Sequence, residues 1–219
     1  RNNEYYSTQA LFDDLYERSQ RGESFTHLME LIASEQNILL AYRAIKKNKG
    51  SKTKGVNSTT IVEMGEKQPE ELIAYVQKRL QNFHPHAVRR VEIPKPDGRM
   101  RPLGIPTMED RIIQQCIKQA LEPIYKHSYG FRPNRSAHHA IARAMFLVNI
   151  SKYRYVVDVD IKGFFDNVDH GKLLKQLWTL GIRDMQLLCV LSKMLKAPIQ
   201  GESVPTKGVP QGGILSPLL

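Results

Sequence analysis

The chain has 219 residues, of which 41% are hydrophobic, so it can bury a sizeable core and is not a disordered tail. Its 32 lysines and arginines exceed its 22 aspartates and glutamates, and the formal net charge is +10. That charge favours a polyanionic partner such as a nucleic acid, although charge alone leaves anionic membranes and acidic proteins open. Separately, no apolar run in the sequence is long enough to span a membrane.

Amphipathic helices are predicted in the N-terminal third of the chain. The first covers residues 8–19 and stops at Gly22, and the second covers residues 26–47 with a break near Ser34. A third starts at Pro69, because proline suits the first helical turn. The residues expected on their buried faces are Leu11, Leu15 and Tyr16, then Leu28, Leu31, Ile32, Ile38, Ala41, Tyr42 and Ile45, then Leu72, Ile73, Val76 and Leu80.

A basic loop is predicted at residues 46–55, where lysines stand among glycine, serine and threonine without an apolar residue. One interpretation is a solvated, mobile connection. The other is a contact for RNA or DNA, since clustered lysines release counterions when they meet phosphates. The lysines are Lys46, Lys47, Lys49, Lys52 and Lys54.

A β-hairpin is predicted in which residues 87–93 alternate apolar and charged side chains, Pro96-Asp97-Gly98 forms the turn, and residues 99–105 return. Cationic hairpin tips are commonly just solvated. A lysine and an arginine mounted on strands can also clamp a triphosphate, the arginine with a planar fork. The cationic residues at or near this tip are Lys95, Arg99 and Arg101.

Thr107 is predicted to cap a helix that runs to about Leu121. A tight loop at residues 129–136 then leads into a helix from Ser136 to about residue 148. The loop combines arginines with aromatic residues, which fits contacts to a nucleic-acid backbone and its bases, although a packed loop with surface arginines is equally open. The arginines are Arg132 and Arg135.

Residues 155–161 form an apolar, β-branched run, which predicts a buried strand. Asp158 and Asp160 share one face of it, because strand side chains repeat every second residue. A single aspartate there could simply cap the following helix. Two like charges on one face, however, are costly unless a cation or a donor meets them.

Two helices with leucine stripes are predicted after this run, one capped by Asp169 and one running from about Asp184 to residue 196. Residues 204–217 form a Gly/Pro-rich loop, whose glycines let the backbone approach a ligand closely. Another helix is predicted to start at the end of this loop, with Ser216 as its cap.

Four motifs in order resemble the N-terminal part of a group II intron-encoded reverse transcriptase, also called a maturase. The resemblance covers nearly the whole chain, and the basic segment matches the N-terminal extension of this family. The motifs are Ile93-Pro94-Lys95-Pro96 with Arg101-Pro102-Leu103-Gly104-Ile105-Pro106, then Tyr129-Gly130-Phe131-Arg132-Pro133, then Asp160-Ile161-Lys162-Gly163-Phe164-Phe165-Asp166, and Pro210-Gln211-Gly212-Gly213-Ile214-Leu215-Ser216-Pro217-Leu218-Leu219.

The resemblance implies an α+β fold, the fingers and partial palm of a right-hand polymerase. This fold is helix-rich, with a fingers β-hairpin and part of an antiparallel palm sheet. The implied division of one continuous domain is an N-terminal extension with the basic loop at residues 1–60, fingers at 61–150 and a partial palm at 151–219.

The resemblance also implies the site residues. Asp160 matches the first catalytic aspartate, and the Ile161 carbonyl matches the metal ligand beside it; the cofactor would be two Mg²⁺ ions that activate the primer 3′-hydroxyl and stabilise the leaving pyrophosphate. Asp158 does not match this position and is expected to be structural. Phe165, grouped with Phe164 in deoxynucleotide binding, matches an aromatic that would collide with a ribose 2′-hydroxyl.

Lys95 and Arg101 match fingers residues that hold the incoming triphosphate, and Gln211 matches the residue that positions the nucleotide against the template. The implied partners are group II intron RNA, an RNA template, a DNA primer and deoxynucleotides.

The two cysteines, Cys116 and Cys189, lie in helical apolar patterns and are typical of reduced core residues. We expect a cytoplasmic protein, bacterial in origin, without a membrane partner. The sequence leaves open whether it forms a homodimer.

The sequence departs from the family in one respect that bears on activity. The other two catalytic aspartates of the family lie in a downstream Tyr-Ala-Asp-Asp hairpin that these 219 residues do not contain. One carboxylate cannot hold two hard cations, so we expect this segment alone to be inactive and the full-length protein to polymerise.

Two other hypotheses compete with polymerisation. One is a maturase that binds RNA and has lost polymerisation. The other takes Asp158-Val159-Asp160 as an aspartyl phosphotransferase motif. That motif requires threonine or valine two residues after the second aspartate, where this chain has Lys162, and it would leave the fingers motifs unexplained.

Overall fold

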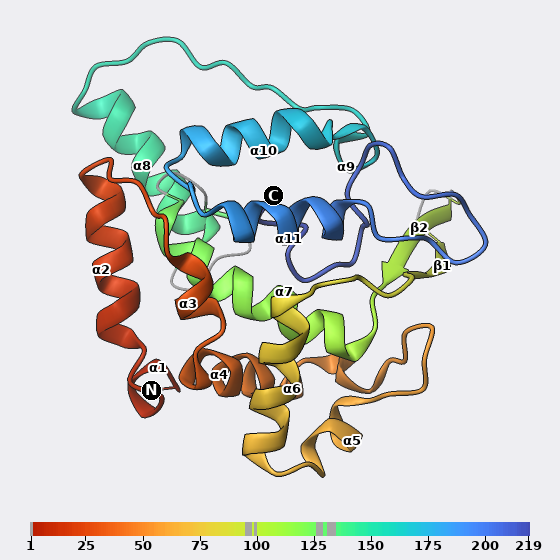
Figure 1. Ribbon diagram of the computed structural model, residues 1–219. Helices are drawn as coiled ribbons and strands as arrows, with labels where there is room; N and C mark the ends of the chain where they lie inside the picture. Colours follow the sequence, from red (N-terminus) through yellow and green to blue (C-terminus); the bar gives the residue numbers. More distant parts are fainter. Residues whose placement is uncertain (1, 95–97, 99, 126–128, 131–134) are drawn as a thin grey trace.

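The computed structural model describes residues 2–94, 98, 100–125, 129–130 and 135–219. Helices dominate these residues, and one β-hairpin lies at the edge of the molecule (Figure 1). The helices and strands, in chain order, are α1 (Asn2–Tyr5), α2 (Gln9–Gln20), α3 (Leu28–Ile32), α4 (Glu35–Lys46), the 3-10 helix η1 (Lys49–Lys52), α5 (Ile61–Gly65), α6 (Pro69–Gln81), β1 (Arg89–Pro94), β2 (Met100–Ile105), α7 (Met108–Leu121), the 3-10 helix η2 (Glu122–Ile124), α8 (Ala137–Asn149), α9 (Phe164–Asn167), α10 (His170–Thr179) and α11 (Met185–Leu195).

Helix α7 is the centre of the hydrophobic core. It contacts α3, α4 and α6, and the same core cluster includes Leu187 and Leu191 of α11. Figure 1 shows α7 crossing the middle of the molecule between α4 and α11. Most of its residues are buried, so the other helices are arranged around it. Its fully buried apolar residues are Met108, Ile112, Ile113, Cys116, Ile117, Ala120 and Leu121.

The predicted break between α3 and α4 is confirmed. The Ser34 hydroxyl accepts a hydrogen bond from the Asn37 backbone N–H and so caps α4. The Asn37 side chain is fully buried; its Nδ2 donates to the carbonyls of Ile32 and Cys116, at 3.1 Å each. Its Oδ1 accepts from Gln119 Nε2 at 2.7 Å. This buried amide therefore ties the α3–α4 junction to α7.

Asp184 joins the N-terminal and C-terminal helices. Its Oδ1 accepts from the backbone N–H of Leu187 at 3.0 Å and so caps α11, the helix predicted to start at about Asp184. Its Oδ2 accepts from the backbone N–H of Met29 in α3 at 2.9 Å. One buried carboxylate thus satisfies donors from two helices that lie far apart in the sequence.

The predicted hairpin is also confirmed. Strands β1 and β2 pair antiparallel, from Arg89 opposite Ile105 to Pro94 opposite Met100. The base of the hairpin is held by the segment after α11: Val88 donates to the Pro198 carbonyl at 2.7 Å and accepts from the Gln200 N–H at 2.9 Å. The hairpin is therefore joined to the C-terminal part of the chain.

The buried strand predicted at residues 155–161 is wrong for this structure. The segment runs as an extended trace across the top of Figure 1, and no described residue pairs with it as a strand. Tyr155 is 94% exposed and Val157 is 83% exposed. A strand needs a neighbour for its N–H and C=O groups, and β1 and β2 pair only with each other. The expected part of the palm sheet is therefore absent from the described residues.

Three smaller predictions are also wrong. Leu11 and Tyr16 are exposed, because α2 packs through Phe12 and Leu15. Cys189 is exposed, since the buried face of α11 runs through Leu187, Val190, Leu191 and Met194. Ser216 does not cap a helix: its hydroxyl donates to the Pro210 carbonyl, and the chain beyond it forms a turn.

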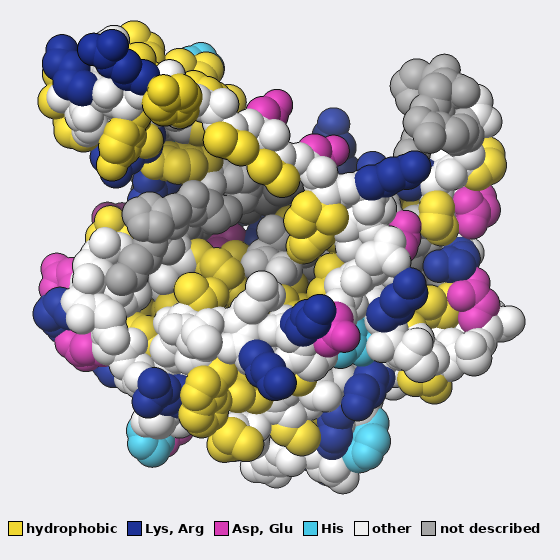
Figure 2. All heavy atoms as spheres, turned by 90° about the horizontal axis from the view of Figure 1, so that it is seen from above, with side chains coloured by type: hydrophobic (Ala, Val, Ile, Leu, Met, Phe, Trp, Pro, Cys, Tyr) yellow, Lys and Arg dark blue, Asp and Glu magenta, His cyan; other side chains and the backbone are white. Residues whose placement is uncertain are grey.

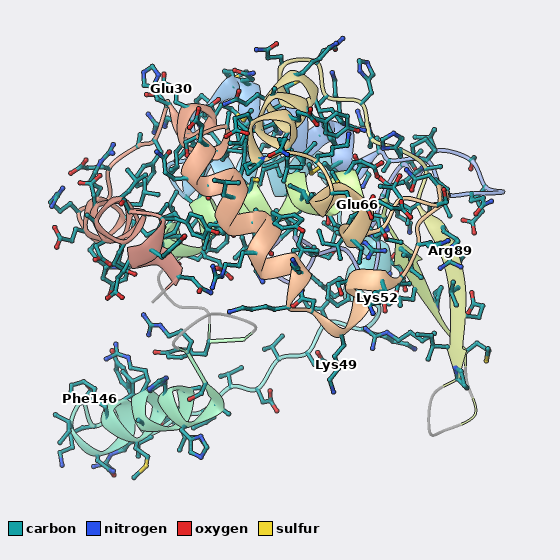
Figure 3. All side chains as sticks on the ribbon, turned by 90° about the horizontal axis from the view of Figure 1, so that it is seen from below. Glu30, Lys49, Lys52, Glu66, Arg89 and Phe146 are labelled. Atoms are coloured by element: carbon teal, nitrogen blue, oxygen red, sulfur yellow. The ribbon has the colours of Figure 1, made fainter. Side chains whose placement is uncertain are left out.

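Helix α8 is confirmed, with Ser136 accepting from the His139 N–H as its cap, but it buries none of its residues. Ile141 and Met145 are each 57% exposed. Figure 2 shows hydrophobic side chains together with Lys and Arg side chains on a lobe that projects at the upper left, and Figure 3 shows α8, marked by Phe146, standing away from the other helices. No helix among the described residues is long and apolar enough to cross a membrane.

Removing the Asp184 carboxylate should destabilise the fold strongly. In Asp184→Ala, the backbone N–H groups of Leu187 and Met29 both lose their acceptor, and we expect the free energy of unfolding to fall by about 2–4 kcal/mol in urea denaturation. Asp169→Ala is the matched control, because Asp169 caps α10 through Lys172 but is exposed. An equal loss in the two variants would contradict the role of Asp184 as a link.

Candidate nucleotide site

A groove of about 370 Å³ lies between the hairpin and a loop formed by residues 203–216, which we call the 203–216 loop. Residues from β1, β2 and α9 also line it, so it joins three segments that are distant in the sequence. The lining residues that matter below are Arg90, Gly104, Phe165, Asp166 and Gln211.

The structure brings together two residues predicted to bind the nucleotide, Arg101 and Gln211. Arg101 Nε donates to Gln211 Oε1 at 2.8 Å, and the Gly104 N–H donates to the Gln211 carbonyl at 2.6 Å. The backbone can approach this closely because Gly212 adopts φ +105°, and a Cβ there would lie 2.7 Å from the Gly104 carbonyl oxygen. The exposed Arg101 guanidinium is thereby held beside Gln211, a residue of the groove, with donors left over for an anion.

Phe165 is attached to the same loop from the opposite side. Helix α9 begins after Gly163, which adopts φ +63°. The Phe165 carbonyl accepts from the Val209 N–H at 2.6 Å, and the Val168 carbonyl accepts from the Gly208 N–H at 2.7 Å. The Phe165 ring is half-buried in an edge-on contact with the more exposed ring of Phe164, with centroids 5.6 Å apart.

Asp160 and Ile161, predicted to bind metal, lie on the exposed extended segment just before α9. Asp158 is also exposed there. Over the described part of the chain, no group of three His, Cys, Asp or Glu side chains is placed to hold a metal ion. Gln211 and Phe165, both predicted to bind the nucleotide, are therefore joined through one loop, whereas no further metal-ligating side chains gather around Asp160 among the described residues.

The lysines of the basic loop are all exposed, as predicted, but the backbone beneath them is ordered by two arginines. Arg111 Nη1 donates to the Gly50 carbonyl at 3.1 Å, and Arg89 Nη2 donates to the Lys54 carbonyl at 2.8 Å. Burial lowers the pKa of the Arg111 guanidinium, and the nearby Arg89 lowers it further. In Figure 3, Lys49 and Lys52 lie on this turn, close to the hairpin that carries Arg89.

Two of the predicted contact residues, Lys95 and Arg132, lie outside the described residues. Arg135 is described: its guanidinium stacks over the Tyr129 ring, with the Cζ atom 5.4 Å from the ring centroid. This contact lies within the protein, so the predicted contact of the loop with nucleic acid stays a prediction.

Some residues that line the groove or contact its lining were not found from the sequence. Arg90 of β1 forms an ion pair with Glu202, Lys207 donates to the Asn167 side chain, and His170 contacts the Gly208 carbonyl. None of these pairs has a sequence signal, because each joins residues that are brought together only by the fold.

Comparison with known proteins supports the motif assignment. Residues 93–219 match the family model described as reverse transcriptase (RNA-dependent DNA polymerase). The chain is 37% identical to the group II intron-encoded protein LtrA of Lactococcus lactis subsp. cremoris, over 97% of this chain and 36% of LtrA. It is 35% identical to protein YkfC of Escherichia coli K12, over 88% of this chain and 53% of that protein.

Among solved structures, the fold resembles a chain of a partial Cas6-RT-Cas1–Cas2 complex, with a TM-score of 0.50 and 23% identity over 89% of this chain and 33% of that chain. This likeness concerns the fold alone. The predicted resemblance to group II intron-encoded reverse transcriptases is confirmed by the sequence matches, although the chain spans only about a third of LtrA. The chain belongs to the reverse transcriptase (RNA-dependent DNA polymerase) family.

Proposed function

We propose that the complete protein containing this chain is an RNA-directed DNA polymerase that binds group II intron RNA and assists splicing and mobility of the intron. The observation that carries this proposal is that the 203–216 loop joins Gln211 and Phe165, which line one groove, and that Arg101 is hydrogen-bonded to Gln211. Arg101 would bind the triphosphate, Gln211 would position the nucleotide and Phe165 would exclude a ribose 2′-hydroxyl.

The Asp160 carboxylate and the Ile161 carbonyl are exposed neighbours and are hard oxygen donors of the kind that Mg²⁺ prefers. They fit part of a magnesium site. Bound Mg²⁺ would supply charge stabilisation and lower the pKa of the attacking primer hydroxyl. Because two oxygens are too few for such an ion, further ligands would come from the nucleotide phosphates, water and another protein segment.

The exposed run at residues 155–161 supports the proposal of a further segment. Its side chains have the β-branched composition of an inner strand, and its backbone has no strand partner among the described residues. We propose that a hairpin of the complete protein, carrying the other catalytic aspartates, pairs with this run and buries it. Pairing would place Asp160 beside those aspartates.

A second candidate function is RNA binding without polymerisation. The ordered, exposed lysine cluster supports it, because such a cluster needs no metal site to bind phosphates. The two candidates differ in one observable: only the polymerase extends a primer with deoxynucleotides when Mg²⁺ is present.

Asp160→Ala in the complete protein should lower primer extension by about 10³-fold or more, since a metal ligand contributes several kcal/mol to the transition state. RNA binding, measured by filter retention, should remain near wild type. Asp158→Ala is the control, because this aspartate lies two residues away but is expected to be structural. Unchanged extension by Asp160→Ala would contradict the polymerase mechanism.

Phe165→Ala should admit ribonucleotides. Loss of the ring removes a steric barrier, so we expect the incorporation of a ribonucleotide relative to a deoxynucleotide to rise by about 10- to 100-fold in single-nucleotide extension assays. Phe164→Ala is the comparison, because its ring is adjacent but more exposed. A similar rise in both variants would show that Phe165 is not the filter.

Neutralising the five lysines of the basic loop to glutamine should weaken RNA binding at low salt and flatten the slope of log affinity against log salt. For each phosphate that a lysine no longer neutralises, the slope should fall by about 0.7–0.9. The control neutralises five exposed lysines elsewhere. An equal change in both sets would reject the loop as a specific contact. The control lysines are Lys67, Lys78, Lys172, Lys175 and Lys196.

A further inference from the structure

His170 is a buried histidine in the first turn of α10 that the proposed chemistry does not use. It is only 6% exposed, and its Nε2 lies 2.7 Å from the carbonyl oxygen of Gly208. A carbonyl can only accept a hydrogen bond, so Nε2 carries the proton and donates. The imidazole therefore holds one peptide group of the 203–216 loop.

The other ring nitrogen shows that packing alone does not account for this histidine. His170 Nδ1 is buried, and it has no hydrogen-bond partner among the described residues. With the proton on Nε2, Nδ1 is an unsatisfied acceptor, and burying such a group opposes folding. A leucine would fill similar space without that penalty, so the reason for an imidazole here must lie in the bond to Gly208.

Gly208 sits at a tight turn of the loop. It adopts φ +87°, and a Cβ would lie 3.0 Å from the Phe165 carbonyl oxygen and 3.1 Å from that of Asp166. Its N–H donates to Val168 at 2.7 Å, and the next N–H, that of Val209, donates to Phe165 at 2.6 Å. The bond from His170 is thus the third that fixes this turn against the Phe165 segment.

The same turn leads to the other side of the nucleotide groove. Beyond Val209, the Pro210 carbonyl accepts from the Ser216 hydroxyl at 2.7 Å. Gln211 then contacts Arg101 and Gly104. The backbone from Gly208 to Gln211 is therefore a short stretch held at both ends: hydrogen bonds tie its start to the Phe165 segment and its end to the hairpin. The Gly208 turn sets the distance between these two ends.

We propose that His170 is a positioning residue for the incoming nucleotide. By holding the Gly208 carbonyl, it fixes where Gln211 stands relative to the Phe165 ring, and it thereby tunes nucleotide binding and the discrimination between deoxyribose and ribose. This role rests on the proposed polymerase function. His170 itself touches neither the groove nor the nucleotide; it acts through the 203–216 loop.

The test uses the complete protein with three variants. His170→Phe keeps a ring and removes the donor, while His170→Gln keeps an amide N–H in place of Nε2. We expect His170→Phe to raise KM for deoxynucleotides about fivefold, which corresponds to the loss of one ordinary hydrogen bond. The change in kcat should be smaller, and discrimination against ribonucleotides should weaken. His170→Gln should restore much of KM. His27→Phe, at an exposed histidine far along the chain, is the control and should behave as wild type.

A second readout needs no activity. Amide hydrogen exchange at Val209 should be faster in His170→Phe than in wild type and His170→Gln, because the turn loses one of its bonds. If wild type extends a primer and His170→Phe changes neither KM nor exchange, the role of His170 is overturned while the polymerase function stands. A lower melting temperature with unchanged KM also overturns it. If wild type extends no primer, the proposed function fails, and the nucleotide role of His170 fails with it.

Discussion

The rest of the structure depends on the burial of α7, because this helix carries both the apolar core and the polar side chains that hold the functional segments. Asp110 accepts from the His86 N–H at 2.8 Å and so fixes the entry to the hairpin. Arg111 holds the Gly50 carbonyl beneath the basic loop. Gln114 accepts from a backbone N–H of the 203–216 loop at 2.8 Å. A helix that cannot move within a close-packed core is a rigid base, so all three segments share one frame.

The two sides of the candidate site differ in how they are built. On the side proposed to bind the nucleotide, backbone hydrogen bonds join the hairpin, the 203–216 loop and α9, and glycines allow the short approaches between them. The groove is therefore organised before any ligand binds, which lowers the cost of ordering side chains on binding. On the metal side, Asp160 lies on an exposed segment without strand pairing among the described residues. A carboxylate is a rigid metal ligand only when the backbone that carries it is rigid.

The exposed apolar surface and the incomplete set of metal ligands both support the proposal that a further segment of the complete protein covers this region. Helix α8 buries none of its residues, and the run at residues 155–161 exposes valines and a tyrosine beside it in the sequence. Exposed apolar side chains gathered on one segment commonly mark an interface. Since the chain spans 36% of LtrA, the proposal that a further segment of the complete protein covers this surface accounts for both features without a separate cause.

Local chemistry in the sequence by itself determined where several helices start and where the β1–β2 hairpin forms. The helix starts are Ser34, Thr107, Ser136, Asp169 and Asp184. Caps, turns and periodicity act within a few residues, so they can be read without the fold. Motifs in fixed order also identified the family. Only the tertiary structure decided that Arg101 meets Gln211 and that His170 meets Gly208, and it gave residues 155–161 no strand partner within the described part of the chain. These outcomes depend on contacts between distant parts of the chain, and strand pairing in particular requires a neighbour that no local pattern can supply.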